Sequence, residues 1–322
     1  MTGQSEETPH LSGSELDLTM VVPYYNPGNR LRPHVEALIA VLKESGLKTE
    51  IIAVSDGSTD ASDKSLDGLA PWALRSIKLP SNQGKGEALR VGLAMGRGRY
   101  VGFIDGDGDL PASLVGSFIE VALADHPDIV LGSKRHPCSQ VIYPPIRRLY
   151  SWGYQQLVRV LFGLPVRDTQ TGIKVVRRAV LADVLPLMVE KRYAFDLELL
   201  VAARQRGHQK ISELPVRIEQ RFTSTVSLPA AWSMLVDTFG IFYRLKVRRA
   251  YGEPSKATAD SDPPNALRPA GEAGPARSPG AGLARPPSYF TVKAQAISDG
   301  SSSSTNPTAN LSLRWAEKRT WL

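Results

Sequence analysis

The chain has 322 residues, of which 42% are hydrophobic, and its formal net charge is +7. Its one cysteine, Cys138, excludes an intrachain disulfide framework and a zinc site built from cysteines alone. The first 16 residues contribute −3 and residues 252–322 contribute +2, so residues 17–251 carry +8. Such a basic excess predicts either a solvated basic face or an anionic partner, which can be nucleic acid, a membrane surface or a phosphorylated substrate.

Composition divides the chain into three segments. Residues 1–16 are polar and acidic with no apolar run, which predicts a disordered tail and no signal peptide. Residues 252–322 hold nine of the 24 prolines and four consecutive serines, so we expect a second disordered tail. The predicted folded domain is residues 17–251. It has no run of about 18 uncharged apolar residues, so no transmembrane helix is expected.

The domain begins with strands that alternate with helices. The predicted strands are residues 18–22, 50–54, 75–79, 100–104 and 129–131. The predicted helices between them are residues 31–45, 61–69, 85–95 and 113–124. This order is typical of an α/β fold with a doubly wound, mostly parallel sheet and flanking helices. Ligands of such sheets bind at the carboxyl ends of the strands, so the candidate site lies in the turns after them.

Three aspartates follow the strand at residues 100–104. Asp105, Asp107 and Asp109 alternate at a spacing of two, so their side chains can converge on one side of an extended segment. Carboxylate oxygens suit magnesium or manganese, which commonly bridge to substrate phosphates. A solvated acidic turn or a weak calcium loop is the alternative interpretation of the same spacing.

The glycines near this edge exclude two nucleotide-binding motifs. Gly84-Lys85-Gly86 lacks the spacing of a P-loop. The turn after the first strand lacks Gly-x-Gly-x-x-Gly, which argues against a nicotinamide dehydrogenase.

Taken together, the turns carry a resemblance to a known family. The segments that carry it are VVPYYN at 21–26, SDGSTD at 55–60, NQGKG at 82–86, DGD at 105–107, GSKRH at 132–136, DTQTGIK at 168–174 and FDLELL at 195–200. In this order they resemble the family 2 glycosyltransferases of GT-A fold. They look like the branch that makes polyprenyl- or dolichyl-phosphate sugars, and the DTQTGIK segment looks more glucosyl-type than mannosyl-type. The resemblance covers about residues 17–250.

The resemblance implies a donor site for a nucleotide sugar, with a divalent metal, magnesium or manganese, on its diphosphate. The residues it assigns to the donor are Pro23, Tyr25, Asp56, Lys85, Asp105 and Asp107. Asp105 and Asp107 would hold the metal, with Asp109 as a further candidate ligand. For Asp56, a turn or helix N-cap is the structural alternative. Arg221 would close over the diphosphate as a catalytic residue, or it is a plain surface arginine.

The resemblance also implies an acceptor site for a lipid phosphate. Arg147 and Ser151 are four residues apart and share a face of a helix. Lys134 and Arg135 would complete the group around the phosphate. Asp168 and Asp196 also lie in matching segments, and structural and catalytic roles are equally open for them.

Two amphipathic helices are expected on the acceptor side, near residues 146–162 and 228–249. Each combines apolar or aromatic residues with arginines. This pattern suits an interfacial helix on the anionic cytoplasmic face of a membrane. A helix packed on the core with a solvated basic face is the alternative, and both can hold for different faces of one helix.

The expected activity is an inverting, metal-dependent transfer of a sugar, from a UDP-linked hexose or N-acetylhexosamine to polyprenyl or dolichyl phosphate. Asp107, Arg147, Ser151 and Arg221 are the expected catalytic residues. A phosphate monoester is largely ionised at pH 7, so no general base is assigned. The expected enzyme is a peripheral protein on the cytoplasmic face of a membrane. The alternatives are a family 2 enzyme that acts on a hydroxyl acceptor and a basic nucleic-acid-binding protein; nucleic acid is not expected as a partner.

Overall fold

The structure is a computed structural model that describes residues 16–70, 73–141, 145–218 and 228–252. The predicted tails, residues 1–16 and 252–322, lie outside the described residues except for Leu16 and Gly252. Arg221 lies outside them as well. Arg147 belongs to a described helix, but its side chain lies outside what is described.

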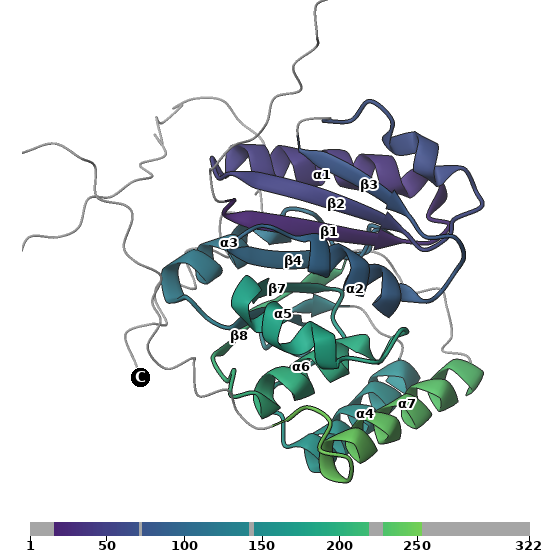
Figure 1. The fold of residues 1–322 in the computed structure, drawn as a ribbon, viewed down its shortest axis with the longest axis vertical. Coiled ribbons are helices and arrows are strands. Elements are labelled where there is room, and N and C mark those ends of the chain that lie inside the picture. Colours follow the sequence, from purple (N-terminus) through teal and green to yellow (C-terminus); the bar gives the residue numbers. More distant parts are fainter. Residues whose placement is uncertain (1–15, 71–72, 142–144, 219–227, 253–322) are drawn as a thin grey trace, which may run out of the picture. The chain divides into compact units, whose positions relative to one another are not determined.

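A seven-stranded sheet forms the centre of the domain (Figure 1). Its strands, in spatial order, are β3 (Leu74–Lys78), β2 (Thr49–Ser55), β1 (Leu18–Tyr24), β4 (Tyr100–Ile104), β7 (Ile173–Arg177), β5 (Ile129–Ser133) and β8 (Ile211–Pro215). Neighbours are parallel except at β7, which runs antiparallel to both β4 and β5. A small parallel pair, β6 (Gln140–Val141) and β9 (Arg217–Ile218), forms a second, two-stranded sheet.

Helices cover both faces of the sheet. One face packs against α2 (Lys85–Met95), α5 (Arg178–Val184) and α6 (Phe195–Gln205), and the other against α1 (Leu31–Glu44) and α3 (Leu114–Asp125). Alternate side chains of a strand point to opposite faces, and here both sets are buried: Val21 lies in the first core, and Met20 and Val22 in the second. The predicted doubly wound, mostly parallel sheet is therefore confirmed.

The predicted acceptor-side helices are α4 (Pro145–Phe162) and α7 (Leu228–Lys246), and they pack against each other (Figure 1). The Tyr154 hydroxyl lies 3.0 Å from Thr238 Oγ1, and the rings of Phe162 and Phe242 meet edge to face at 6.1 Å. Ile241 is fully buried. The inner face of α7 thus belongs to the core, as one of the two interpretations of this helix expects.

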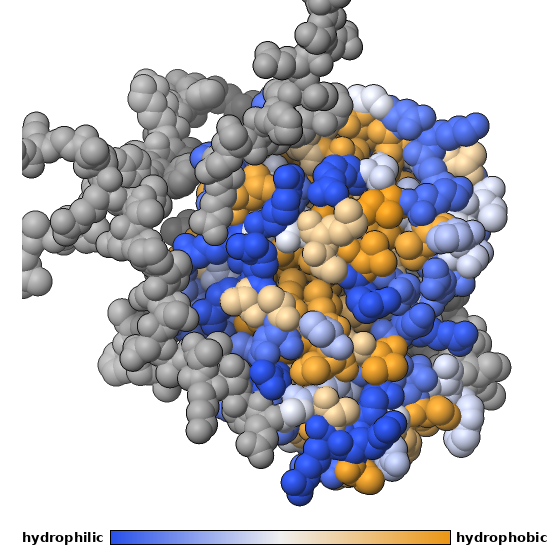
Figure 2. Space-filling model, viewed as in Figure 1, coloured by the Kyte–Doolittle hydropathy of each residue, from blue (hydrophilic) through white to orange (hydrophobic). Residues whose placement is uncertain are grey.

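The outer face of α7 carries a hydrophobic stripe. Its members recur at helical spacing and are 51–69% exposed: Trp232, Val236, Phe239 and Tyr243. Figure 2 shows hydrophobic residues at the surface over this end of the domain, interrupted by hydrophilic ones. None of the described helices is long and apolar enough to cross a membrane.

Two local predictions differ from the structure. The segment predicted as a helix at 61–69 contains only a 3-10 turn, η2 (Ser62–Leu66), because Ala61 adopts a left-handed φ of 61° and the Asp60 carboxylate binds the Ser62 N–H. No element was predicted between residues 163 and 227, so the antiparallel strand β7 was missed together with α5, α6, β8 and β9, and the short strand β6 was not predicted either. The remaining 3-10 turns are η1 (Gly28–Arg30) and η3 (Leu185–Leu187).

Candidate active site

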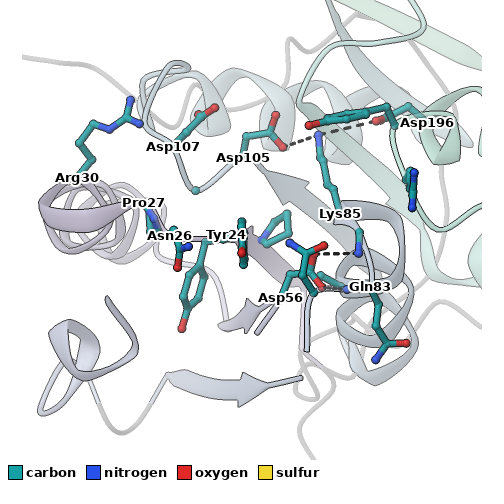
Figure 3. A pocket seen from close by; sticks show the side chains of 18 of the residues that line it. Tyr24, Asn26, Pro27, Arg30, Asp56, Gln83, Lys85, Asp105, Asp107 and Asp196 are labelled. Atoms are coloured by element: carbon teal, nitrogen blue, oxygen red, sulfur yellow. Dashed lines mark hydrogen bonds and ion pairs between the residues drawn. The ribbon is translucent and has the colours of Figure 1, made fainter. Parts of the chain in front are cut away.

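A pocket of about 600 Å³ opens at the carboxyl ends of β1, β2 and β4 (Figure 3). This is the edge at which the sequence predicts ligand binding. Most of the pocket wall consists of residues 23–27, Asp56, residues 82–85 and residues 105–107. Pro23, Tyr25, Asp56, Lys85, Asp105 and Asp107, the predicted donor and metal residues, all line it. The structure therefore brings together every residue that the sequence assigns to the donor.

Asp56 ties two of the predicted turns into one unit. Its side chain is almost fully buried, and its two oxygens accept the backbone N–H groups of Gln83 at 2.7 Å and Gly84 at 2.9 Å. Gly84 has a φ of 105°, and a Cβ there would lie 2.4 Å from the Lys191 carbonyl oxygen. Asp56 therefore shapes the segment that enters α2, and it does not cap the η2 turn that follows it in the sequence.

Four charges alternate in a row from the pocket into the core. In order, they are Asp105, Lys85, Asp196 and Lys174, and Figure 3 shows Asp105, Lys85 and Asp196. Lys85 Nζ lies 2.6 Å from Asp105 Oδ1 and 3.8 Å from Asp196 Oδ2. Lys174 Nζ lies 2.5 Å from Asp196 Oδ1. Lys174 is fully buried and also donates to the Thr171 carbonyl at 2.9 Å. Burial alone would lower the pKa of Lys85, but the charges of Asp105 and Asp196 outweigh it and raise that pKa. Lys85 therefore stays cationic in the pocket wall.

The acidic turn fits a divalent cation with two of its three aspartates. Asp105 and Asp107 face the pocket, while the Asp109 carboxylate lies 3.8 Å from Arg30 and does not line it. Among the described residues, no group of three His, Cys, Asp or Glu side chains is arranged to hold a metal ion without further ligands. The backbone at Gly172 packs against the Asp105 carboxylate, since a Cβ there would lie 2.0 Å from Asp105 Oδ2, so residue 172 leaves no room for a side chain beside this carboxylate. Two carboxylates suit Mg²⁺ or Mn²⁺ when substrate phosphates supply further oxygens.

Asp168 holds the turn that carries the predicted acceptor lysine. Its carboxylate accepts the Lys134 backbone N–H at 3.0 Å, the Gln170 N–H at 2.9 Å and the Thr171 hydroxyl at 2.7 Å. Lys134 Nζ in turn donates to the Gln170 carbonyl at 2.9 Å. Of the two roles open for Asp168, the geometry supports the structural one.

The stability that Asp168 contributes should depend on pH. Burial alone would raise the pKa of its carboxyl, but the Lys134 charge and the hydrogen bonds hold the pKa below its usual value. Stabilisation from a lowered pKa is complete above the unfolded-state value, about 4, and is lost as the pH falls toward the folded-state value. Asp168→Asn should therefore destabilise the fold by about 2 kcal/mol at pH 7 and by clearly less at pH 3.

Denaturant unfolding of the wild type and the variant at both pH values measures this difference. Glu36→Gln, which removes an exposed partner of Arg32 on α1, is the control and should change the free energy of unfolding little at either pH. A constant penalty for Asp168→Asn between pH 7 and pH 3 would show that the carboxyl has no lowered pKa.

Among the predicted acceptor residues whose side chains are described, Lys134, Arg135 and Ser151 lie beyond the pocket lining. Arg135 Nη2 donates to Ser151 Oγ of α4 at 2.9 Å, so two of the four come together. Lys134 follows directly at the end of β5. The backbone of Arg147 lies one turn before Ser151 on α4.

The pocket also contains residues that the sequence did not indicate. They include Arg30, Ala88, Gln170, Arg192 and Tyr193. Gln170 lies inside the DTQTGIK segment, and Arg192 and Tyr193 closely precede the FDLELL segment, so proximity to a recognised segment was the available signal. Arg30 lies four residues after the VVPYYN segment, and the fold of η1 brings it to the pocket.

Comparisons with known proteins agree with the geometry. Residues 19–185 match the model of the family described as glycosyl transferase family 2. The dolichyl-phosphate beta-glucosyltransferase of Saccharomyces cerevisiae is 32% identical over 229 residues, 64% of this chain and 68% of that protein. The enzyme of the same name from Drosophila melanogaster is 32% identical over 262 residues, 74% of this chain and 78% of that protein.

Solved structures share the fold. Glucosyl-3-phosphoglycerate synthase from Mycobacterium tuberculosis, in complex with UDP, has a TM-score of 0.56 at 19% identity, over 75% of this chain and 82% of that chain. The same enzyme is also known with Mn²⁺, UDP-glucose and phosphoglyceric acid, at a TM-score of 0.56. The expected GT-A fold and the expected resemblance to the glucosyl-type branch are both confirmed.

Proposed function

Because the chain belongs to glycosyl transferase family 2 and is a glycosyltransferase, we propose that it transfers glucose from UDP-glucose to dolichyl or polyprenyl phosphate. The relatives named above are dolichyl-phosphate beta-glucosyltransferases, which supports both the sugar and the acceptor. UDP and UDP-glucose occupy structural neighbours of the same fold, which supports the donor.

The observation that carries the proposal is that, among the described residues, the carboxylates of the pocket are either bound within the protein or belong to the proposed metal pair, which leaves none assigned as a general base. Among the described residues, four aspartates line the pocket. Asp56 is bonded to two backbone N–H groups, and Asp196 is held by two lysines. Asp105 and Asp107 form the pair suited to a metal. A sugar hydroxyl needs a base to become a nucleophile, whereas a phosphate monoester is already ionised at pH 7. The hydroxyl-acceptor alternative is therefore disfavoured.

We propose that Asp105 and Asp107 hold a Mg²⁺ or Mn²⁺ ion. A structural neighbour of the same fold that was crystallised with Mn²⁺ supports this proposal. The bound ion would offset negative charge on the donor diphosphate. Lys85 would add a second positive charge near the donor diphosphate. Its ion pairs with Asp105 and Asp196 keep its amine protonated and in place. Pro23 and Tyr25 form the wall at the end of β1, where a nucleotide base would lie.

On the acceptor side, Lys134, Arg135, Arg147 and Ser151 are the proposed phosphate residues. Cations there would hold two anionic substrates together against their mutual repulsion. In-line attack of a phosphate oxygen on the anomeric carbon would form the new carbon–oxygen bond as the bond to the diphosphate breaks and UDP leaves, so the carbon inverts and an α-linked donor gives a β-linked product. The word "beta" in the names of the relatives agrees with this stereochemistry.

The stripe Trp232, Val236, Phe239 and Tyr243 supports a peripheral position on a membrane, because exposed aromatic and aliphatic side chains at helical spacing suit a lipid interface. Lys246, Arg248 and Arg249 follow it and are exposed, which favours an anionic leaflet such as the cytoplasmic one. The nucleic-acid alternative explains neither this stripe nor the acidic pocket.

A panel of radiolabelled nucleotide sugars, incubated with the purified enzyme, dolichyl phosphate in vesicles and Mg²⁺ or Mn²⁺, tests the proposal. UDP-glucose should give a lipid product that mild acid hydrolyses, and GDP-mannose should give none. Chelation of the metal should stop the transfer. Failure to label lipid from any donor would overturn the proposal, and label in water-soluble sugars alone would favour a hydroxyl acceptor.

A further inference from the structure

Glu198 is a buried carboxylate that the proposed reaction does not use. It lies in the first turn of α6, two residues after Asp196, and is 0% exposed. Its Oε2 accepts the backbone N–H groups of Val189 at 2.9 Å and Glu190 at 2.7 Å. Its Oε1 accepts Arg244 Nη2 at 3.1 Å and the Tyr251 hydroxyl at 2.7 Å. One carboxylate thus joins α6, the segment before it, α7 and the residues after α7.

Residues 189–193, the segment whose first two N–H groups bind Glu198, form part of the pocket wall. Arg192 and Tyr193 line the pocket directly. The Lys191 carbonyl accepts the Glu87 N–H of α2 at 3.1 Å. Gly86 lies so close that a Cβ there would be 2.7 Å from the Lys191 carbonyl carbon. The segment therefore packs without a gap on the first turn of α2, which carries Lys85.

Arg244 fixes the other end of this connection. It is mostly buried on α7 and forms ion pairs with Glu198 and with Glu190 of the bound segment. Tyr251 is fully buried beside it. The contacts run without interruption from α7 through Glu198 and residues 189–193 to the start of α2.

Stability alone does not require this arrangement. Buried ion pairs lose much of their attraction to desolvation, and apolar residues of similar volume commonly serve as well or better. A carboxylate that accepts four donors from three elements does what an apolar side chain cannot: it sets the position of a backbone segment. That segment is a wall of the pocket.

We propose that Glu198 is a positioning residue for the nucleotide-sugar pocket, holding residues 189–193 against the first turn of α2, and that Arg244 of α7 keeps Glu198 in this role. The pocket's identity as a nucleotide-sugar site rests on the proposed function; the mechanical connection does not. The helix that bears the exposed stripe is thereby tied to the donor side of the enzyme.

The test compares Arg244→Met with Arg206→Met. Both arginines are about one-fifth exposed and form ion pairs, but Arg206 binds Asp183 of α5, which does not line the pocket. Hydrogen exchange is measured in the free enzyme for peptides covering residues 83–95. Exchange at the start of α2 should quicken about tenfold in Arg244→Met and stay unchanged in Arg206→Met. The Kd of UDP, measured by calorimetry with Mn²⁺, should rise about tenfold in Arg244→Met alone.

Two further measurements keep the outcome decisive. Tyr251→Phe removes one hydroxyl donor to Glu198 at a smaller cost in stability and should shift both readouts in the same direction. The KM for UDP-glucose should rise more than kcat falls. Unchanged exchange at residues 83–95 in both Arg244→Met and Tyr251→Phe, or equal effects in Arg206→Met, would overturn the inference. If the exchange at residues 83–95 changes in the variants but the wild type binds no UDP, the proposed donor is wrong. The contact path from Arg244 through Glu198 to α2 would then still stand.

Discussion

Asp107→Ala should reduce the rate of sugar transfer by about a thousandfold. The Asp107 carboxylate faces the pocket together with Asp105, and the two are the oxygen pair suited to the metal. A metal on a leaving diphosphate is worth several kcal/mol of charge stabilisation, and each 1.36 kcal/mol corresponds to about tenfold in rate. The measurement is the initial rate of glucose transfer to dolichyl phosphate at saturating Mn²⁺, with the Mn²⁺ affinity of each variant measured separately.

Asp109→Asn is the matched control. Asp109 belongs to the same turn, but its carboxylate lies by Arg30 and outside the pocket lining. We expect its rate to stay within about threefold of the wild type, as for an exposed ion pair. If Asp109→Asn loses as much activity as Asp107→Ala, all three aspartates hold the metal, as the spacing in the sequence first indicated. If Asp107→Ala keeps its activity and its Mn²⁺ affinity, the pair is not the metal site.

Lys174→Met should lower the free energy of unfolding by about 3 kcal/mol. Lys174 is fully buried, and its removal leaves the Asp196 carboxylate inside the core without its nearest positive charge. Breaking a buried pair by removing one partner typically costs about 3–5 kcal/mol. We expect the lower end of this range, because Lys85 stays 3.8 Å from Asp196. Denaturant unfolding of the two proteins measures the difference.

Two comparisons separate the buried pair from a general loss of charge. Lys174→Met combined with Asp196→Asn removes both charges, so the double variant should lose less stability than the two single variants added together. Lys78→Met breaks the pair between Lys78 and Asp63, in which the lysine is 57% exposed, and should cost at most about 1 kcal/mol. Equal losses for Lys174→Met and Lys78→Met would show that burial adds nothing to the inner pair.

Much of the donor site was predictable because its residues follow strands directly. Asp105 and Asp107 come after β4, and Pro23 and Tyr25 lie at or beside the end of β1. Parallel strands bring their carboxyl ends to one edge, so local sequence was enough to predict that these side chains share a pocket. The roles of Asp56 and Asp168 were harder to predict, since the backbone partners of Asp56 lie 27 and 28 residues away and the Lys134 partner of Asp168 lies 34 residues away.

The amino-acid sequence alone specifies which face of each strand and helix is buried, through the alternation of residues in strands and their spacing in helices. It also specifies which polar groups occupy the turns after the strands. It does not show which elements meet. The direction of β7 brings Gly172 and Lys174 to the edge where Asp105 lies, and no periodicity reveals that direction. Glu198 and Arg244 are 46 residues apart, and they meet because two separate helices bury their inner faces in one core. Local sequence patterns predict which side chains are buried, whereas contacts between distant elements depend on how all the buried faces pack together.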